Sequence, residues 1–432
     1  MNPFPPSLLQ AAIDKPVMVG FSGGLDSTVL LHLLANSPGR RPGSLRALHV
    51  HHGLQALADD WQQHCRSLCA QWDIPLQVVH VEVPRDAGQG LEAAARDARH
   101  AAFRTHLQAG EWLALAHHQD DQAETFLLRA LRGASVDGLA AMKAQRSFGT
   151  STLWRPLLEM PRSALEAYAN QHRLHWIDDP SNDSADFDRN FLRLQVLPLL
   201  RQRWPHATAA MARSAELAMQ AAQLLHETDA GLLQQCQGQG RTLQLAGLAQ
   251  LTPAQRSRVL RLWVEQQGLP ALPANGVLAI QQQLLVSGHD QQAEFRWQQA
   301  RIVRWRDQLH TLPLPAAWPE GWMLHWNGSG PAALPDGGRL LLHGVSAFER
   351  PLLLRQRQGG ERIQLPGRSH SHKLKHCLQQ ADVAPWLRAR LPLLCDGDYV
   401  LAAADRVISA QLQAGLQAHG AHLEWQPPDP VN

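Results

Sequence analysis

Phe21-Ser22-Gly23-Gly24-Leu25-Asp26-Ser27 is the stretch of this chain that decides its fold. It follows an apolar run at Val17–Val19 and precedes a helical pattern that begins at Thr28, an order typical of a strand, a glycine turn and a helix. Because glycine lacks a Cβ, the turn can be tight, and its N–H groups and the following helix N-terminus can face one anion. Asp26 adds a carboxylate that suits a bridging Mg²⁺. The stretch therefore predicts a pyrophosphate cradle.

The glycine turn differs from the common P-loop. That motif requires G-x-x-x-x-G-K-[ST], and the chain contains no Gly-Lys dipeptide. S-G-G-L-D-S instead resembles the PP-loop of the N-type ATP pyrophosphatases, which cleave ATP between the α- and β-phosphates and adenylate a substrate. An ordinary Ser/Gly turn is the alternative, and the strand before it, the helix after it and Asp26 within it argue against that alternative.

The composition bounds the class of protein. A length of 432 residues predicts two or three domains, and a hydrophobic content of 44% is enough for sizeable cores. Since the net charge is only +2, any nucleic-acid surface must be local. Five scattered cysteines and no secretory signal indicate a reducing cytoplasm. Without a run of about 18 apolar residues, we expect no membrane span.

The first half of the chain has the pattern of an α/β domain built on a doubly wound parallel sheet. Strands are predicted at Val17–Val19, Leu45–Val50, Leu76–Val83 and Trp112–Ala116, alternating with helices at Thr28–Leu34, Asp59–Gln71, Leu91–Leu107 and Asp121–Leu131. Strands separated by helices imply a parallel sheet, and such sheets bind ligands beyond the carboxyl ends of their strands. The residues that follow each strand are therefore candidates for chemistry.

Polar residues follow the second and fourth predicted strands. His49 and His51 end the second, and H-H-Q-D-D-Q-A-E, from His117 to Glu124, follows the fourth. A helix cap and first-turn acid explain one carboxylate but not the histidines or Glu124. Asp121 and Glu124 are three residues apart, so on a helix they share a face and can hold Mg²⁺ or an ammonium group. A zinc site is the weaker alternative, because no second ligand pair stands at helical spacing.

Two further segments carry charge. Arg96 and Arg99 share a face of the third predicted helix, where they can meet phosphates or form a solvated surface. An aspartate-rich loop, D-D-P-S-N at 178–182, leads into a helix predicted at Phe191–Leu200. A solvated loop would explain these acids but not the apolar residues W-I at 176–177 that precede them.

Taken together, these motifs resemble the bacterial tRNA(Ile)-lysidine synthases. The matching motifs are, in chain order, S-G-G-L-D-S, H-V-H-H-G-L, L-E-A-A-A-R-x-x-R, H-x-x-D-D-Q-A-E-T, R-P-L-L followed by an Arg, and D-D-P-S-N ending in R-N-x-x-R. They cover about residues 15–200. The PP-loop alone fixes only the superfamily, whereas the D-D-Q-A-E-T and D-P-S-N…R-N segments together are much more specific.

The resemblance implies an ATP-consuming ligase. In that family ATP binds with Mg²⁺, and O2 of the wobble cytidine in the CAU anticodon of tRNA(Ile) attacks the α-phosphate. Pyrophosphate leaves, and the side-chain amino group of free L-lysine then attacks C2 and expels AMP. The product, lysidine, pairs with A instead of G, so the codon changes from AUG to AUA and the identity from methionine to isoleucine.

The same resemblance assigns roles to residues of this chain. The ATP site is expected to comprise Ser22, Gly23, Gly24, Leu25, Asp26, Ser27, His49, His51, Arg96 and Arg99, with Asp26 and Asp120 at the Mg²⁺. Asp26, Asp121 and Glu124 are the expected catalytic residues, and Asp121, Glu124 and His117 the expected lysine site. Contacts with tRNA are expected from Arg189, Asn190, Arg193, Arg362, Lys373, Lys375, Arg388 and Arg390.

The rest of the chain predicts domains that contact tRNA. We expect a catalytic domain at 1–210, a mostly helical middle domain at 211–312, a Pro/Gly-rich linker with short strands at 313–345 and a small α+β domain at 346–432. Thr252-Pro253 has the pattern of a cap and first residue of a helix that runs through Val264.

The C-terminal domain is locally basic. Between Pro351 and Pro392 eight Lys and Arg residues stand against two acids, which is typical of a phosphate-backbone surface, with an ordinary basic surface as the alternative. R-x-G-G-E-R, K-L-K and V-A-P-W-L-R-x-R-L-P-L-L resemble the family's C-terminal tRNA-binding domain. His376 is a departure, since another basic residue is expected after Lys375.

Three other functions fit parts of the sequence. A PP-loop enzyme of tRNA thiolation would use paired cysteines, and the chain has no C-x-x-C. An amide-forming synthetase of the NAD or GMP kind needs an ammonia source and leaves the basic C-terminal region unexplained. An inactive tRNA-binding module is disfavoured by the intact Asp26, Asp121 and Glu124. The sequence does not give the oligomeric state, so a homodimer stays open.

Overall fold

The computed structural model describes residues 4–53, 57–83, 91–180, 184–185, 187–285, 293–314 and 318–427. The chain divides into two compact units, Met1–Leu225 and His226–Asn432. The four-part division predicted from the sequence is finer than this one and stays a prediction. Ser181 and Asn182 of the predicted D-D-P-S-N loop lie outside the described residues.

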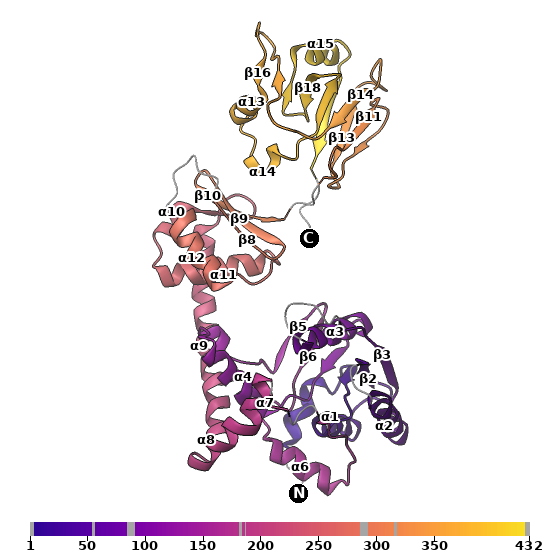
Figure 1. The fold of residues 1–432 in the computed structure, drawn as a ribbon. Coiled ribbons are helices and arrows are strands. Elements are labelled where there is room, and N and C mark those ends of the chain that lie inside the picture. The colour runs from indigo at the N-terminus through magenta and orange to yellow at the C-terminus, as the bar shows by residue number, and fades with distance from the viewer. Residues whose placement is uncertain are drawn as a thin grey trace. The chain divides into compact units, whose positions relative to one another are not determined.

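The first unit contains a six-stranded sheet in the order β3-β2-β1-β4-β6-β5 (Figure 1). Its strands are β1 (Val17–Gly20), β2 (Leu45–His51), β3 (Leu76–His80), β4 (Trp112–Ala114), β5 (Gln145–Phe148) and β6 (Ser151–Trp154). Neighbours from β3 to β6 pair in parallel, and the edge strand β5 pairs antiparallel with β6. The predicted doubly wound parallel sheet is confirmed, although the β5–β6 hairpin was not predicted, because most of β5 is exposed and lacks an apolar alternation.

Helices follow the first four strands as predicted. They are α1 (Leu25–Ala35), α2 (Ala58–Gln71), α3 (Leu91–His106) and α4 (Gln119–Leu131). Helix α1 begins earlier than predicted because Gly24, with an extended backbone at φ −75° and ψ 167°, is its N-cap. The positive end of the α1 dipole therefore lies within the glycine turn itself.

The sheet is covered by apolar side chains on both faces. Val17 and Val19 of β1 belong to a core that includes Leu30 of α1. Met18, between them, faces a second core that contains Leu113. Burial on both faces is what a parallel sheet with helical crossovers requires, and it explains why β1 is an unbroken apolar run.

The strand order reverses at β1. Strands β2 and β3 lie on one side of β1, and β4 and β6 lie on the other. A crevice forms outside the carboxyl ends of the strands at such a reversal and is where ligands of this fold class bind. The glycine turn follows β1 and the H-H-Q-D-D segment follows β4, so both motifs face this crevice.

The first unit is completed by helical segments. These are the 3₁₀ helix η1 (Pro6–Ala12), α5 (Val136–Leu139), α6 (Arg162–Gln171), α7 (Asp188–Phe191), the π-helix η3 (Leu192–Val196), α8 (Leu197–Arg203) and α9 (Ala207–Cys236), which continues into the second unit. Helix α6 packs on α1, and α7 packs on α4. The helix predicted at Phe191–Leu200 is thus interrupted by a π turn, a feature frequent at functional sites.

The middle region of the chain combines helices with a sheet. The helices are α10 (Leu245–Ala249), α11 (Pro253–Gln266), α12 (Ala274–Ala279) and the π-helix η4 (Ile280–Leu284). The helix predicted from Thr252-Pro253 is confirmed as α11, where Thr252 and Gln255 form a capping box.

The predicted helical middle region is confirmed, and a four-stranded antiparallel sheet, which was not predicted, accompanies its helices. Its order is β7-β10-β9-β8, with β7 (Thr242–Gln244), β8 (Glu294–Trp297), β9 (Ala300–Trp305) and β10 (Gln308–Pro313). The Ala/Gln/Leu-rich average of the region hid these strands, because three of them are confined to its end.

The C-terminal region is built from small sheets and short helices. One sheet contains β11 (Met323–Trp326), β14 (Leu352–Arg355), β17 (Leu393–Asp396), β18 (Tyr399–Ala403) and β19 (Val407–Ile408), and a second contains β12 (Ala332–Ala333), β13 (Arg339–His343) and β20 (His422–Gln426). A ribbon of β15 (Arg362–Ile363) and β16 (His372–Lys373) and the helices α13 (Leu374–Gln380), α14 (Pro385–Arg388) and α15 (Ala410–Ala418) complete it.

The stretch predicted as a linker, 313–345, belongs in large part to this C-terminal core. Trp318, Trp326 and Leu340 are buried there with residues of β14 and β17. The apolar area of the buried tryptophans holds this stretch on the C-terminal core, and the boundaries predicted for the linker stay a prediction. In the described part of the chain, no helix is long and apolar enough to cross a membrane.

Gly23 is the position at which the fold of the crevice depends on a missing side chain. Its φ is +84°, and a Cβ there would lie 2.8 Å from Cys65 Sγ and 3.1 Å from Ile177 Cδ1. Gly23→Ala should lower the free energy of unfolding by about 2–4 kcal/mol, from backbone strain plus overpacking. Gly43→Ala is the matched control, because Gly43 has φ +75° with open space around its Cβ position, and should cost about 1 kcal/mol. Urea denaturation measures both, and equal losses would contradict the packing argument.

Candidate active site

Two hydroxyl groups shape the turn between β1 and α1. Ser22 Oγ lies 3.0 Å from Ser27 Oγ, and the Ser22 N–H donates to Ser27 Oγ at 3.3 Å. Ser27 Oγ also donates to the Gly24 carbonyl at 3.1 Å. These bonds fold the turn back onto the first turn of α1, whose leading N–H groups have no carbonyl partner within the helix. The turn is thus an anion-binding element with its hydroxyls in place.

Neighbouring strands and loops hold this turn in position. The Phe21 N–H donates to the Leu48 carbonyl at 2.9 Å, and His49 Nδ1 donates to the Phe21 carbonyl at 2.9 Å. His49 is buried, and burial lowers its pKa, so its ring is neutral. On the other side, the Ile177 N–H donates to the Gly23 carbonyl at 2.9 Å. The aspartate-rich segment that follows Ile177 is therefore tied directly to the glycine turn.

His118 connects the glycine turn to the segment after β4. Its side chain is 1% exposed and lies 3.6 Å from the Asp26 carboxylate, 3.4 Å from that of Asp121 and 3.9 Å from that of Asp120. Burial opposes charge on the ring, but the three carboxylates outweigh it and raise the pKa of His118 above its ordinary value. Its backbone N–H also donates to Asp121 Oδ2 at 3.0 Å. His118 is thus both the N-cap of α4 and a bridge between the two motifs.

Asp121 and Glu124 are paired with two arginines that follow the aspartate-rich loop. Arg189 donates to Glu124 at 2.7 Å and to Asp121 at 2.8 Å. Arg193 donates to Glu124 at 2.7 Å and lies 3.3 Å from Asp121. We call these four residues the carboxylate–arginine cluster. Its two negative and two positive charges balance, and it fastens α4 to α7 and η3.

The cluster is buried, which makes its pairing consequential. The Glu124 side chain is fully buried, and that of Asp121 is 11% exposed. Burial alone would raise the pKa of Asp121, but His118 and Arg189 outweigh it and hold that pKa well below its usual range. Burial also opposes the charges of Arg189 and Arg193, and the carboxylates raise the pKa of both guanidinium groups. Asp121, Arg189 and Arg193 are therefore charged at neutral pH.

Asp120 is engaged separately from the cluster. Its Oδ1 accepts a hydrogen bond from Arg201 of α8, and its Oδ2 accepts one from the Arg162 backbone N–H at 3.1 Å. Asp120 therefore ties α4 to α8 and to the start of α6. The predicted Mg²⁺ role of Asp120 stays a prediction, and it would require the ion to share a carboxylate that already holds these partners.

A cavity of about 570 Å³ opens beside these groups. Polar residues in its lining include His118, Asp120, Glu124, Asp178, Asp179, Arg193 and Arg201, and Pro180, Leu194 and Leu197 add apolar surface. Its volume falls in the range of small-molecule sites. A charged metabolite of modest size fits the chemistry of this lining.

His117 lies at the same edge but does not join the cluster. Arg155 Nε donates to His117 Nδ1 at 3.1 Å. Burial lowers the pKa of His117 to about 3, so the ring is neutral at pH 7 and carries its proton on Nε2. The free Nε2–H can therefore donate to an acceptor.

The other residues predicted at the ATP site lie around the crevice. The His51 and His80 rings are in tilted contact, with ring centroids 4.5 Å apart, and His51 Nε2 lies 3.2 Å from Asp59. Arg96 and Arg99 are exposed on α3. Unlike Asp26, His118 and Asp121, these residues are not gathered into one contact group.

One carboxylate oxygen of the crevice is suited to a cation. Asp26 Oδ1 is buried and has no hydrogen-bond partner among the described residues. No group of three His, Cys, Asp or Glu residues that could hold a metal by itself occurs in the same part of the chain. A single carboxylate next to a phosphate site fits Mg²⁺, which completes its coordination with water and substrate phosphates.

Comparisons with known proteins bear on this geometry. Family models match residues 6–200 as a PP-loop domain, 243–310 as a TilS substrate binding domain and 352–425 as a TilS substrate C-terminal domain. A tRNA(Ile)-lysidine synthase of Xanthomonas campestris pv. campestris is 55% identical over 427 residues, 98% of each chain. This chain belongs to the tRNA(Ile)-lysidine synthase family. The synthase of Xylella fastidiosa strain Temecula1 is 51% identical over 95% of each chain, and that of Serratia proteamaculans is 42% identical over 96% of this chain and 97% of its own.

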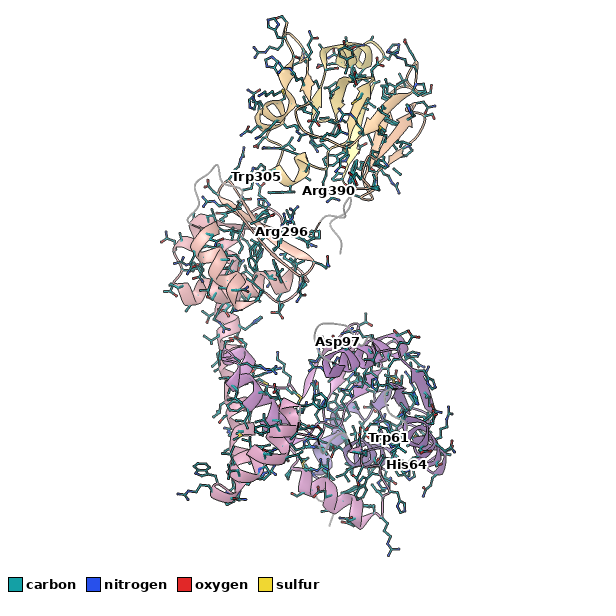
Figure 2. All side chains as sticks on the ribbon, viewed as in Figure 1. Trp61, His64, Asp97, Arg296, Trp305 and Arg390 are labelled. Carbon is teal, nitrogen blue, oxygen red and sulfur yellow. The ribbon has the colours of Figure 1, made fainter. Side chains whose placement is uncertain are left out.

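In the present chain, some basic residues of the C-terminal region have internal partners and others are exposed. Arg390 pairs with Asp336 at 3.0 Å, and Arg388 donates to the Val383 carbonyl at 2.6 Å (Figure 2 labels Arg390). Arg357 lies 3.5 Å from Glu361, which also accepts two backbone N–H bonds.

Arg362, Lys373 and Lys375 are exposed at the β15–β16 ribbon and the start of α13. Arg362 pairs in register with Lys373 across the ribbon and donates to Ser371 Oγ at 2.9 Å. Of the five basic residues predicted here to contact tRNA, these three present charge to solvent.

Sequence reasoning missed several residues of the site. His118 was not assigned a role in the sequence analysis. It stands three residues before Asp121, which is the spacing between the N-cap and the N3 residue of a capping box, and this spacing could have identified it. Arg201 lies 81 residues from its partner Asp120, and no local signal could have revealed that pair. Arg189 and Arg193 pair with Asp121 and Glu124, which the sequence did not reveal, and their predicted contact with tRNA stays a prediction.

Removing one member of the carboxylate–arginine cluster should be strongly destabilising. Glu124→Leu leaves Arg189 and Arg193 with a single carboxylate, and the free energy of unfolding should fall by about 3–5 kcal/mol. Arg132→Ala is the control, because the Arg132–Asp188 pair is 70% and 75% exposed and should contribute under about 1 kcal/mol. Denaturant titration measures both variants. A Glu124→Leu protein as stable as the control would show that the cluster does not hold α4 and α7 together.

Proposed function

We propose that this chain ligates free L-lysine to C2 of the wobble cytidine of the CAU-anticodon isoleucine tRNA, with conversion of ATP to AMP and pyrophosphate. One observation carries the proposal: His118 bridges the glycine turn at Asp26 to Asp121 of the D-D-Q-A-E-T segment. An ATP-cleaving element and an acidic element thus meet at one edge of the sheet. The membership of the family fixes the reaction class, and the residues below are assigned from their contacts.

In the first step, cytidine O2 forms a bond to the α-phosphorus of ATP, and the bond from that phosphorus to the pyrophosphate oxygen breaks. The N–H groups at the start of α1 and the hydroxyl of Ser22 are positioned to stabilise charge on the departing pyrophosphate. Asp26 would hold Mg²⁺ through Oδ1, and the ion would supply charge neutralisation at the phosphates. Protonated His118 would keep Asp26 oriented.

In the second step, the side-chain nitrogen of lysine forms a bond to C2 and loses a proton, while the bond from C2 to the AMP oxygen breaks. We assign Asp121 and Glu124 to the cationic end of lysine. Both already hold Arg189 and Arg193, so binding a further cation requires an arginine to release part of its pairing. The Nε2–H of His117 is free to donate a hydrogen bond to the carboxylate of lysine or to the wobble cytosine.

We assign tRNA contacts first to Arg362, Lys373 and Lys375, which are exposed. Arg388 and Arg390 already have internal partners and can add to the surface only through their remaining N–H groups. Asn190 donates to the Ser184 carbonyl at 2.9 Å, so it positions the loop before α7. His49, His51, Arg96 and Arg99 remain our proposal for the outer ATP site.

We also propose that the protein is located in the cytoplasm and that it can form a homodimer. Free, buried cysteines support the location, since all five are reduced thiols in the structure. A size-exclusion measurement with light scattering decides between monomer and dimer.

The test of the function is incorporation of labelled L-lysine into an isoleucine tRNA transcript with a CAU anticodon, in the presence of ATP and Mg²⁺. The matched control is the same transcript with uridine at the wobble position. We expect lysine in the cytidine transcript only, with AMP released in equal amount. ATP cleavage to AMP without lysine incorporation would keep the pyrophosphatase chemistry and overturn the substrate assignment.

The exposed ribbon charges should account for part of the salt dependence of tRNA binding. Lys373→Ala combined with Lys375→Ala should weaken binding and reduce the slope of log K against log salt by about 2, since each phosphate contact contributes about one unit. Arg406→Ala is a control, because that side chain pairs with Asp405 in the same region. Filter binding between low and high salt gives the slope. An unchanged slope would remove this ribbon from the tRNA surface.

A further inference from the structure

A second group of positive charges on the catalytic unit begins at Arg96, which is also part of the proposed outer ATP site, and extends away from the glycine turn. Arg96 and Arg104 of α3 and Arg146 of β5 are exposed, and Arg129 and Arg155 lie partly or fully buried nearby. Mutual repulsion among these guanidinium groups shows that they are neighbours: Arg96 and Arg104 both lower the pKa of Arg146, after the larger effect of burial. We call Arg96, Arg104 and Arg146 the α3–β5 arginine surface.

Phe148 organises this surface. The guanidinium of Arg104 lies 5.2 Å from the centre of the Phe148 ring, and that of Arg146 lies 5.6 Å from it. Both distances are those of cation–π contacts. The His100 ring stands edge-on to the same ring at 5.8 Å. The two arginines are therefore fixed by stacking and leave their N–H groups available to an acceptor.

The surface has no acidic counterpart in the described part of the chain. Among the described side chains, a set that leaves out Glu92 of α3, no carboxylate lies within ion-pair distance of Arg96, Arg104 or Arg146. Asp97 projects from the same helix (Figure 2) but pairs with none of the three. His100 adds no charge, because burial first and the surrounding arginines second lower its pKa to about 4. Uncompensated like charges raise the energy of the fold, and such local conflicts are expected where a ligand supplies the missing charge.

Protection of an exposed sheet edge is the simplest alternative. Arg146 lies on the edge strand β5, where a charge discourages pairing with another chain. Arg96 and Arg104 lie on a helix, however, and cannot serve that purpose. They are eight residues apart, so the charges extend about 12 Å along α3. An extended row fits a polyanion better than a single small anion.

The row also leads away from the catalytic crevice. Beside the crevice, the buried Arg155, which is not part of this surface, donates to His117 at 3.1 Å and to the carbonyl of the exposed Lys143 at 2.8 Å. At the other end, Arg104 is in the last turn of α3. Since α3 connects the parallel strands β3 and β4, its C-terminus lies toward the amino ends of the strands. Arg104 is thus far from the glycine turn that faces ATP.

We propose that the α3–β5 arginine surface binds the phosphate backbone of the anticodon arm while the wobble base occupies the crevice. The proposal rests on the proposed function and adds a docking surface on the catalytic unit itself. Its ligand is RNA phosphate, which would supply the negative charge that the described side chains around the α3–β5 arginine surface do not provide. Because the contacts are to phosphate, they position the tRNA and do not read its bases.

The test uses the full chain and the CAU transcript. In Arg104→Ala with Arg146→Ala, the Kd for the transcript should rise about tenfold at moderate salt, and the salt slope should fall by about 2. The affinity for ATP should stay that of the unchanged protein. Lys15→Ala with Arg41→Ala is the matched control, because both side chains are exposed and lie shortly before β1 and β2, toward the amino edge of the sheet.

Arg104→Lys with Arg146→Lys separates charge from packing, because lysine keeps a phosphate contact as a point charge. Restoration of the slope by the lysine pair supports the proposal. The proposal would be overturned if the alanine pair left the salt slope unchanged or lowered the affinity for ATP. It would also be overturned if the alanine pair lost tRNA affinity together with a lower melting temperature and the lysine pair did not restore that affinity. In all these cases, lysine incorporation by the unchanged protein would still support the proposed function. If the unchanged protein neither bound nor modified the transcript, the proposed function and the docking surface would both be wrong.

Discussion

The site depends on the pairing of Asp121 and Glu124 with Arg189 and Arg193. Two buried carboxylates on one face of α4 would repel each other and resist burial without these partners. The arginines follow the aspartate-rich loop in the chain, so the pairing fixes α7 and η3 beside α4. Cavity, loop and helix α4 are therefore parts of one electrostatic unit. Any substrate cation that enters must be accommodated by this charge balance.

The parallel sheet supplies the second constraint. A reversal of strand order at β1 brings the segments after β1 and β4 to one edge, although they are about ninety residues apart. His118 then converts this proximity into contact, since it lies between Asp26 and Asp121. The same sheet places β5 at its far edge, where the α3–β5 arginine surface begins. Fold topology thus sets both where ATP chemistry occurs and where a long anionic substrate can lie.

Much of this could be predicted from the sequence, because the decisive signals were local. The strand-turn-helix around Gly23 and the cap at Thr252 follow from short-range rules and are confirmed. The features that the sequence did not reveal are set by distant contacts. Trp318 appeared to belong to a linker but is buried in the C-terminal core, and Arg189 turned toward partners more than sixty residues away. Residue spacing along the chain carries no information about such pairs.

We propose that one crevice performs both the adenylation and the lysine transfer. The most direct measurement is to incubate the chain with the CAU transcript and ATP labelled at the α-phosphate, without lysine, and then to add lysine. We predict label attached to the transcript at the wobble cytidine, followed by its release as AMP when lysine is added. Release of AMP before lysine is present, with no labelled transcript at any time, would contradict the account.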